Sequence, residues 1–404
     1  MSLRTFLTAE RMKLQERIRE INALLPTLPR MSSQTPAPAP IPVRVAAPVL
    51  DFGVERLKQF AGPMLPATEV HSKGGDYAKY EAMGNQWLMT HWNQSGQNWE
   101  ADFYNCGAIE YVWWARTGDD VFKQQARAKA LDYRVKYLEA NNYGSSAHWA
   151  MLQSVFFDWL VTGDTASHKA IGRFATLFSA PYYKDRLTVI VDREPTDNRI
   201  QSRVLTAFLY AHLAGIAKTP AAPNIQPGGA DWGLPGGADI PTLLRKALTD
   251  ILSTQSADGS YMYPNASNGK FNKVFMVCLL NQAMIEYYEH FEKDPRILSS
   301  VQRSCDYMWS KQFDQTKLAW YYPGNAPPVV STETAVPEIS PGLNGLALPA
   351  WGWLYKMTKD AKYKTQGDLI LKGAMAGTWF TGQKEFNQTY IYSYRYFAWI
   401  KGVP

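Results

Sequence analysis

The sequence of 404 residues has few cysteines and no apolar run long enough for a membrane span. Its three cysteines, Cys106, Cys278 and Cys305, are too scattered for a disulfide framework or a zinc site, and we predict three buried thiols. The longest apolar stretches are Val204–Ala217 and Val274–Ile285, both shorter than the ~20 residues that cross a bilayer. We therefore expect neither a disulfide-stabilised protein nor a membrane span.

Charge is also scarce, and its pattern argues against several classes of function. Charged residues make up 19% of the chain against 46% hydrophobic residues, which excludes a disordered protein. The 42 basic and 36 acidic residues give a net charge of +6, which favours an anionic partner, but no dense run of Lys or Arg indicates nucleic acid. Dispersed histidines and the lack of a Gly-x-Ser-x-Gly segment or a phosphate-binding loop argue against a metal site, a serine hydrolase and a nucleotide cofactor. No cofactor is expected.

The first 49 residues differ in composition from the rest. An amphipathic helix is predicted near residues 8–25, because Leu7, Leu14 and Ile21 fall seven residues apart. Residues 31–49 carry five prolines interspersed with alanine, which is typical of an extended spacer. We predict a docking or self-association arm over residues 1–30, a linker over 31–49 and a body over 50–404. The alternative is a first helix that packs on its own body.

From residue 50 onward, amphipathic and uniformly apolar helical segments alternate. Connectors such as Thr117–Asp119, in which Gly ends one helix and Asp begins the next, recur in related form at 162–164, 293–295 and 358–360. Repeats of this length without an obvious polar end cap favour a closed ring. The predicted outer–inner hairpins are 77–93 with 102–116, 120–140 with 147–161, 165–178 with 199–217, 241–255 with 271–292, 295–312 with 342–357, and 361–378 with 387–401.

This alternation, with its Thr-Gly-Asp connectors, resembles the six-hairpin (α/α)6 toroids of glycoside hydrolases and polysaccharide lyases over about residues 70–404. The resemblance implies an all-α toroid, preceded here by the helical arm and the Pro-rich linker, and a carbohydrate-processing activity. Because such toroids host several chemistries, the resemblance does not single out one reaction.

Connections from outer to inner helices are mostly longer than those from inner to outer helices, so we expect a binding cleft at the rim that they form. Aromatic side chains are frequent there, and their flat faces match the C–H faces of sugars. Any single ring is better explained as part of the core wall, but as a set at the loop ends the rings favour a glycan cleft. The candidate substrate-binding residues are Trp99, Tyr104, Tyr143, Trp149, Tyr261, Tyr263, Trp320 and Tyr322.

One candidate catalytic group suits elimination at a uronic acid. That reaction needs a neutralised carboxylate, removal of the C5 proton and protonation of the leaving oxygen, which Asn, Arg, His and Tyr can provide. The segment 141–149 is similar to the Asn-Asn-His…Tyr-Trp segment of toroid alginate lyases, which would match Asn142 and His148, with Arg199 or Arg203 as the arginine. Five residues separate His148 from Asn142, a departure from the lyase pattern. In a purely structural interpretation, Asn142 makes a turn and His148 packs or caps.

A pair of carboxylates would instead suit glycoside hydrolysis, at a separation of ~5–5.5 Å for retention or ~6.5–9.5 Å for inversion. Asp102 and Glu333 are the preferred candidates, and each also has a structural interpretation. The other acidic residues of the rim are Glu100, Glu194, Asp197, Asp258 and Glu338. Elimination and hydrolysis stay open as alternatives.

The sequence therefore predicts a protein that binds and cleaves an anionic, uronate-containing polysaccharide. A catalytically inert glycan receptor or structural protein is the alternative. Such a toroid is useful outside a cell, yet residues 1–30 lack the apolar core of a signal peptide. We therefore expect a protein made in the host cytoplasm and carried on a phage virion, attached to tail proteins through residues 1–48, with a cytoplasmic enzyme as the alternative.

Overall fold

The computed structural model describes residues 51–91, 99–145, 149–180, 197–225, 232–234, 236–265, 269–322, 338–377 and 383–402. Contacts divide the chain into two units, residues 1–43 and 44–404, and all described residues belong to the second. The predicted arm and linker lie outside the described residues.

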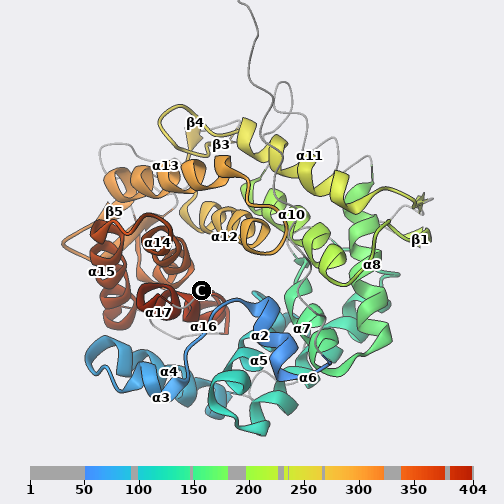
Figure 1. The fold of residues 1–404 in the computed structure, drawn as a ribbon, viewed down its shortest axis with the longest axis horizontal. Coiled ribbons are helices and arrows are strands. Elements are labelled where there is room, and N and C mark those ends of the chain that lie inside the picture. Colours follow the sequence, from blue (N-terminus) through green and yellow to red (C-terminus); the bar gives the residue numbers. More distant parts are fainter. Residues whose placement is uncertain are drawn as a thin grey trace, which may run out of the picture. The chain divides into compact units, whose positions relative to one another are not determined.

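The helices of this unit form outer–inner pairs that follow one another around a ring (Figure 1). Two short helices, α2 (Val54–Ala61) and α3 (Ala67–His71), precede the first pair. The pairs are α4 (Gly75–His91) with α5 (Cys106–Thr117), α6 (Asp120–Tyr133) with α7 (Leu152–Thr162), α8 (Thr165–Ser179) with α10 (Asn198–Leu213), α11 (Ile240–Ser253) with α12 (Val274–His290), α13 (Pro295–Gln312) with α14 (Asn344–Thr358), and α15 (Ala361–Gly377) with α16 (Gln383–Tyr390) and α17 (Tyr394–Lys401). The predicted all-α toroid of six hairpins is thereby confirmed.

The connectors recognised in the sequence end and begin helices as predicted. Gly118 and Gly163 adopt left-handed conformations, with φ of 77° and 72°, directly after α5 and α7. The next residue, Asp119 or Asp164, accepts backbone N–H groups in the first turn of the following helix. These local interactions satisfy polar groups at both helix ends, so a short connector joins neighbouring hairpins.

Burial separates the two sets of helices. In the inner helix α12, every residue from Val274 to Tyr287 is buried, whereas in the outer helix α11 the buried side chains form one stripe (Ile240, Leu244, Ala247, Leu248 and Ile251). The ring closes where the last pair meets the first. There, the Tyr390 hydroxyl of α16 donates to the Tyr80 carbonyl of α4 at 2.8 Å, and the hydroxyls of Tyr80 and Ser393 lie 2.7 Å apart.

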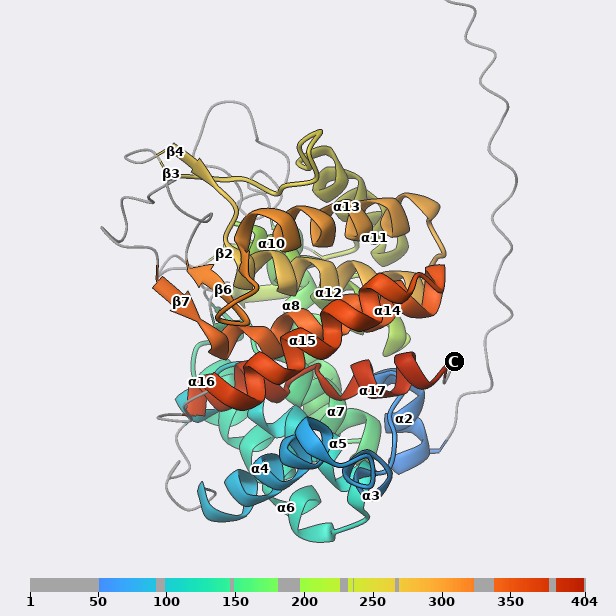
Figure 2. The same cartoon turned by 90° about the vertical axis from the view of Figure 1, so that its left-hand side faces the viewer.

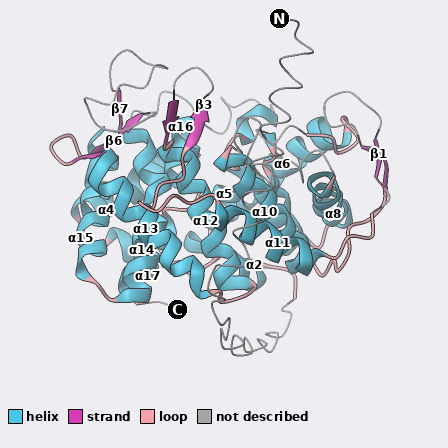
Figure 3. Ribbon diagram, turned by 90° about the horizontal axis from the view of Figure 1, so that it is seen from above, coloured by secondary structure: helices cyan, strands magenta, loops and turns pink. Residues whose placement is uncertain are grey.

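The structure also contains features that the sequence did not predict. The last inner helix is interrupted at residues 391–393, and α6 continues as a π-helix over Arg134–Glu139. Short antiparallel strands occur in segments predicted as loops: β1 (Ala222–Ile225) with β2 (Trp232–Leu234), β3 (Tyr263–Asn265) with β4 (Gly269–Phe271), and β5 (Phe313–Asp314) with β6 (Ala319–Tyr322) and β7 (Glu338–Ser340). Hairpin β3–β4 and strands β6–β7 lie at the end of the ring where α16 begins (Figures 2 and 3). No helix within the described ranges has the length and apolar character needed to cross a bilayer.

Candidate functional site

A cavity of about 360 Å³ opens at the rim where inner helices begin. Its walls come from the segment before α5, from the first turns of α10, α12 and α16, from β6 and β7, and from the 3₁₀ turn Pro341–Leu343. The connections from outer to inner helices form this rim. The lining residues are Phe103, Tyr104, Arg199, Phe275, Tyr322, Ser340, Gly342, Leu343, Lys384, Glu385 and Gln388.

Tyr104 is held in the cavity wall by an unusual backbone. Both Tyr104 and Asn105 have positive φ, 65° and 56°, a conformation that costs energy for residues with a side chain. The Tyr104 N–H donates to the sulfur of Met151 at 3.2 Å, and the Asn105 amide oxygen accepts the N–H of Gln153 at 3.0 Å. The Tyr104 hydroxyl also hydrogen-bonds with Gln388 on the opposite element α16. These contacts fix the ring at the cavity surface.

The remaining wall combines aromatic rings with charged groups. The rings of Phe275 and Tyr322 lie 5.8 Å apart, and the Arg199 guanidinium lies 5.7 Å from the Phe275 ring. Arg199 also forms an ion pair with Asp197 at 3.1 Å. Asp197 in turn accepts the Arg199 N–H, so this carboxylate caps α10.

The first turn of α16 adds a cation and an acid, Lys384 and Glu385. Lys384 is exposed and Glu385 is half-buried. Among the described residues that line the cavity, Glu385 is the one acidic side chain. The described lining of the cavity therefore offers two cations, one carboxylate, four tyrosine or phenylalanine rings and the amide of Gln388.

Asp102, a candidate acid from the sequence, lies beneath this wall. Asp102 is the last residue of the 3₁₀ helix η2 (Trp99–Asp102), and its side chain is buried. Its Oδ1 accepts hydrogen bonds from the Gly107 N–H at 2.8 Å and from the Ser154 hydroxyl at 2.9 Å. Burial raises the pKa of Asp102 to about 7, although both hydrogen bonds and the charge of Lys129 oppose that rise. Asp102 thus joins the first turn of α5 to α7 and does not line the cavity.

We expect Asp102→Asn to change the pH dependence of stability. In the wild type, the raised pKa of Asp102 adds to the free energy of unfolding while the carboxyl is protonated. This contribution is fully present below pH 3.8, the ordinary pKa of the group, and is lost as the pH rises through about 7. Asparagine keeps the acceptor oxygen and carries no charge, so its contribution does not vary with pH. The free energy of unfolding of the variant, relative to that of the wild type, should therefore rise by about 2–4 kcal/mol from pH 5 to pH 9. Chemical denaturation of both proteins at the two pH values measures this gain. A difference that does not vary with pH would contradict it.

The residues proposed for elimination are dispersed. Arg199 lines the large cavity, whereas Arg203, one turn further along α10, lines a separate small cavity. Asn142 is exposed in the turn after the π-helix, with φ of 50°, and lines neither cavity. His148 and the acids Glu333 and Glu194 lie outside the described residues.

The aromatic candidates divide between the cavity, its surroundings and the core. Tyr104 and Tyr322 line the cavity. Trp99 stacks on Tyr137 at 4.3 Å, and Trp149 lies 4.9 Å from the lining residue Phe103, so both are connected to the cavity through neighbouring rings. Tyr143 is half-buried beside Lys169, whereas Tyr261 and Trp320 are fully buried in the core. The side chain of Tyr263 is not among those described.

Sequence reasoning missed the contribution of α16. The last inner helix was predicted to begin at residue 387, which placed Lys384 and Glu385 in the connecting loop before it. The helix in fact begins at Gln383. The sequence did offer one signal for these residues. The segment connects an outer helix to an inner helix, as do the other segments from which a binding cleft was predicted.

Comparison with known proteins supports the architecture. No protein-family model matches the sequence, and no curated protein matches it. A solved structure described as that of an unsaturated glucuronyl hydrolase specific for heparin is similar, with a TM-score of 0.50 and 12% sequence identity over 75% of this chain and 86% of that chain. At this identity the similarity concerns the fold. Together with the ring of outer and inner helices, it assigns an (α/α)6 toroid to the body of this protein.

Proposed function

We propose that the protein binds an acidic, uronate-containing saccharide in the large cavity and hydrolyses it. The observation that carries this proposal is the composition of the cavity, which places two cations and one carboxylate among aromatic walls. The fold is compatible, because the similar solved structure is that of a hydrolase named for an unsaturated glucuronyl substrate.

Recognition of the saccharide would use the cations and the rings together. The guanidinium of Arg199 presents paired donors that suit the carboxylate of a uronic acid, and Lys384 adds a mobile positive charge. Phe275 and Tyr322 offer flat apolar faces for the sugar ring. The Gln388 amide can bind a hydroxyl, since an amide both donates and accepts.

Catalysis would use Glu385 as the acid that serves the leaving group. Its carboxyl proton passes to the glycosidic oxygen as that bond to the anomeric carbon breaks, and water adds to the anomeric carbon and releases a proton. A half-buried position beside Lys384 lets this group exchange protons with solvent between turnovers. Arg199 and Lys384 would hold the substrate carboxylate away from Glu385.

The proposal is tested by incubating the protein with uronate-rich polymers and with oligosaccharides that end in an unsaturated glucuronyl group. New reducing ends or released uronate without a gain in ultraviolet absorbance would indicate hydrolysis. A gain in absorbance would indicate elimination, the alternative chemistry raised by Asn142 and His148. If a broad panel of acidic glycans yields neither product, the enzyme proposal fails.

A second candidate, an inert glycan receptor, is favoured by one observation. Hydrolysis of an ordinary glycosidic bond generally uses two carboxylates, whereas the described part of the cavity wall supplies Glu385 alone. A receptor would retain acidic glycans without cleaving them. In that case Arg199→Gln would weaken retention and Glu385→Gln would leave it unchanged.

We further propose that residues 1–48 attach the body to a larger particle such as a phage tail, by a heptad-like helix and a Pro-rich spacer. Deleting residues 1–48 should leave the body folded and able to bind saccharide, while co-sedimentation with the assembled particle is lost. Circular dichroism, glycan binding and sedimentation check these three outcomes. Unfolding of the shortened protein would instead assign the first helix to the core of the body.

A further inference from the structure

A row of half-buried aromatic rings leads away from the large cavity. The connections from outer to inner helices of the first two hairpins, and the π-helix before the second, contribute these rings. We call them the aromatic track, and they are Phe103, Trp149, Trp99, Tyr137 and Tyr143. Phe103 also lines the cavity, and its ring centroid lies 4.9 Å from that of Trp149. Trp99 continues the row, 4.8 Å from Trp149 and 4.3 Å from Tyr137.

The far end of the aromatic track carries positive charge. The exposed Lys169 of α8 has its Nζ 5.6 Å from the centre of the Tyr143 ring. The guanidiniums of Arg134 and Arg173 also act electrostatically on the Tyr143 hydroxyl. Glu139 acts on it with opposite sign, but its carboxylate is paired with Arg134 at 3.2 Å. Lys169 and Arg173 therefore favour a negatively charged group at this end.

Exposure sets the aromatic track apart from the other large rings. Trp113, Trp320 and Trp351 are buried in the core, whereas every residue of the track keeps part of its surface exposed. Contact of large rings with water is unfavourable, and neighbouring exposed rings are typical of a binding surface. The track therefore favours a ligand with flat apolar faces.

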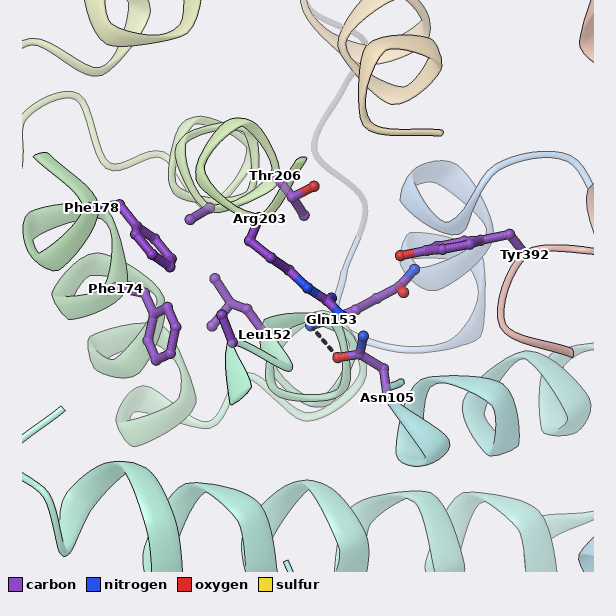
Figure 4. A pocket seen from close by; sticks show the side chains of 10 residues that line it. Asn105, Leu152, Gln153, Phe174, Phe178, Arg203, Thr206 and Tyr392 are labelled. Carbon is purple, nitrogen blue, oxygen red and sulfur yellow. Dashed lines mark hydrogen bonds between the residues drawn. The ribbon is translucent and has the colours of Figure 1, made fainter. Parts of the chain in front are cut away.

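Buried hydrogen bonds hold the backbone that carries these rings. The amide oxygen of Asn105, in the segment before α5, accepts the N–H of Gln153 at 3.0 Å, and Figure 4 shows this contact as a dashed line. The Tyr133 hydroxyl donates to the carbonyl of Trp149 and accepts the N–H of Met151 at 3.0 Å. A surface that is ordered before it binds loses less conformational entropy on binding.

We propose that the aromatic track binds successive sugar units of an acidic polysaccharide chain, one unit of which occupies the large cavity. This inference rests on the proposed function and extends it, because it assigns a long acidic chain as the ligand in place of a short oligosaccharide. The rings match the C–H faces of the sugars. Arg199 and Lys384 in the cavity and Lys169 at the far end supply cations for carboxylates along the chain.

The dependence of affinity on chain length tests the proposal. Calorimetry is carried out in the Glu385→Gln background, which keeps the ligand intact under the proposed mechanism. Binding of uronate oligosaccharides should tighten from the disaccharide to longer chains and then level off, and neutral glucan chains of equal length should bind more weakly. Equal affinity for all lengths, or for long neutral and long acidic chains, would overturn the proposal.

Substitutions in the same background assign the effect to the track. Trp99→Ala should raise the dissociation constant for the longest chains about 10-fold and leave that for the disaccharide unchanged, whereas Trp99→Phe keeps a flat ring and should retain most of the affinity. Lys169→Gln, at an exposed position, should raise the same constant about 2- to 5-fold. The matched control is Lys123→Gln, since Lys123 lies 4.9 Å from the Trp114 ring near the start of α6, at the end remote from the π-helix.

Two results with these variants would contradict the assignment. One is a Trp99→Ala or Lys169→Gln protein that binds the longest chains as tightly as its background. The other is an equal loss of affinity for the disaccharide, which would place the effect in the cavity.

Product analysis of the wild type separates this proposal from the proposed hydrolysis. Length-dependent binding without cleavage of any chain would remove the hydrolysis and keep the aromatic track as the surface of a receptor. Cleavage of short and long chains that bind with equal affinity would keep the hydrolysis and remove the track.

Discussion

Replacing Glu385 with glutamine should lower kcat for saccharide hydrolysis about 10²- to 10⁴-fold, the range that a general acid contributes. Glutamine has the same shape and keeps an acceptor oxygen, but it has no proton to deliver to the leaving group. The side chain is half-buried in the first turn of α16, so little packing changes. Steady-state kinetics on the best substrate of the glycan panel measures the loss.

The matched variant for this experiment is Arg199→Gln. Because Arg199 is proposed to hold the substrate carboxylate, its replacement should raise KM far more than it lowers kcat. The two variants would thus separate recognition from proton transfer within one cavity. A Glu385→Gln protein with unchanged kcat would remove this residue from the mechanism. A melting temperature far below that of the wild type would instead show that the carboxylate is structural.

Replacing Arg395 with methionine should destabilise the body by about 3–5 kcal/mol, because it leaves a buried carboxylate without its cation. Arg395 lies in α17 and forms an ion pair at 2.8 Å with Glu286 of α12, and both side chains are almost completely buried. Its Nε also donates to the carbonyl of Ala61 at 2.8 Å, which ties the end of α2 to the last inner helix. The side chain also packs closely on Gly62, where an added Cβ atom would lie 2.9 Å from the Arg395 Nε.

Chemical denaturation monitored by circular dichroism measures this loss. Lys401→Met is the matched control, since Lys401 lies on the same helix and pairs with Glu69 at the surface, where such pairs contribute ~0–1 kcal/mol. Adding Glu286→Gln to Arg395→Met should recover part of the stability, because the stranded charge is then removed. A single Arg395→Met variant as stable as Lys401→Met would show that this buried pair contributes little.

Individual residues show how much of the site could be predicted from the sequence. Arg199, Tyr104 and Tyr322 were candidates from the sequence, and all three line the cavity. Trp320 and Tyr322 lie on one face of β6, yet the first packs against Trp351 in the core and the second reaches the cavity. Alternation along a strand predicts the face of a side chain but not its depth in the fold. Glu385 was missed because a one-turn error in the start of α16 moved it from a helix to a loop.

The sequence by itself determined the helices, their order in hairpins and the all-α ring, because caps such as Asp119 and Asp164 and the 3.6-residue periodicity act within a few residues of the chain. Only the tertiary structure decided which polar groups meet. Arg199 of α10 and Glu385 of α16 come to line one cavity through the packing of helices far apart in sequence. These residues come together only when the ring closes. Local sequence patterns favour a closed ring, but they do not specify which side chains become neighbours in it.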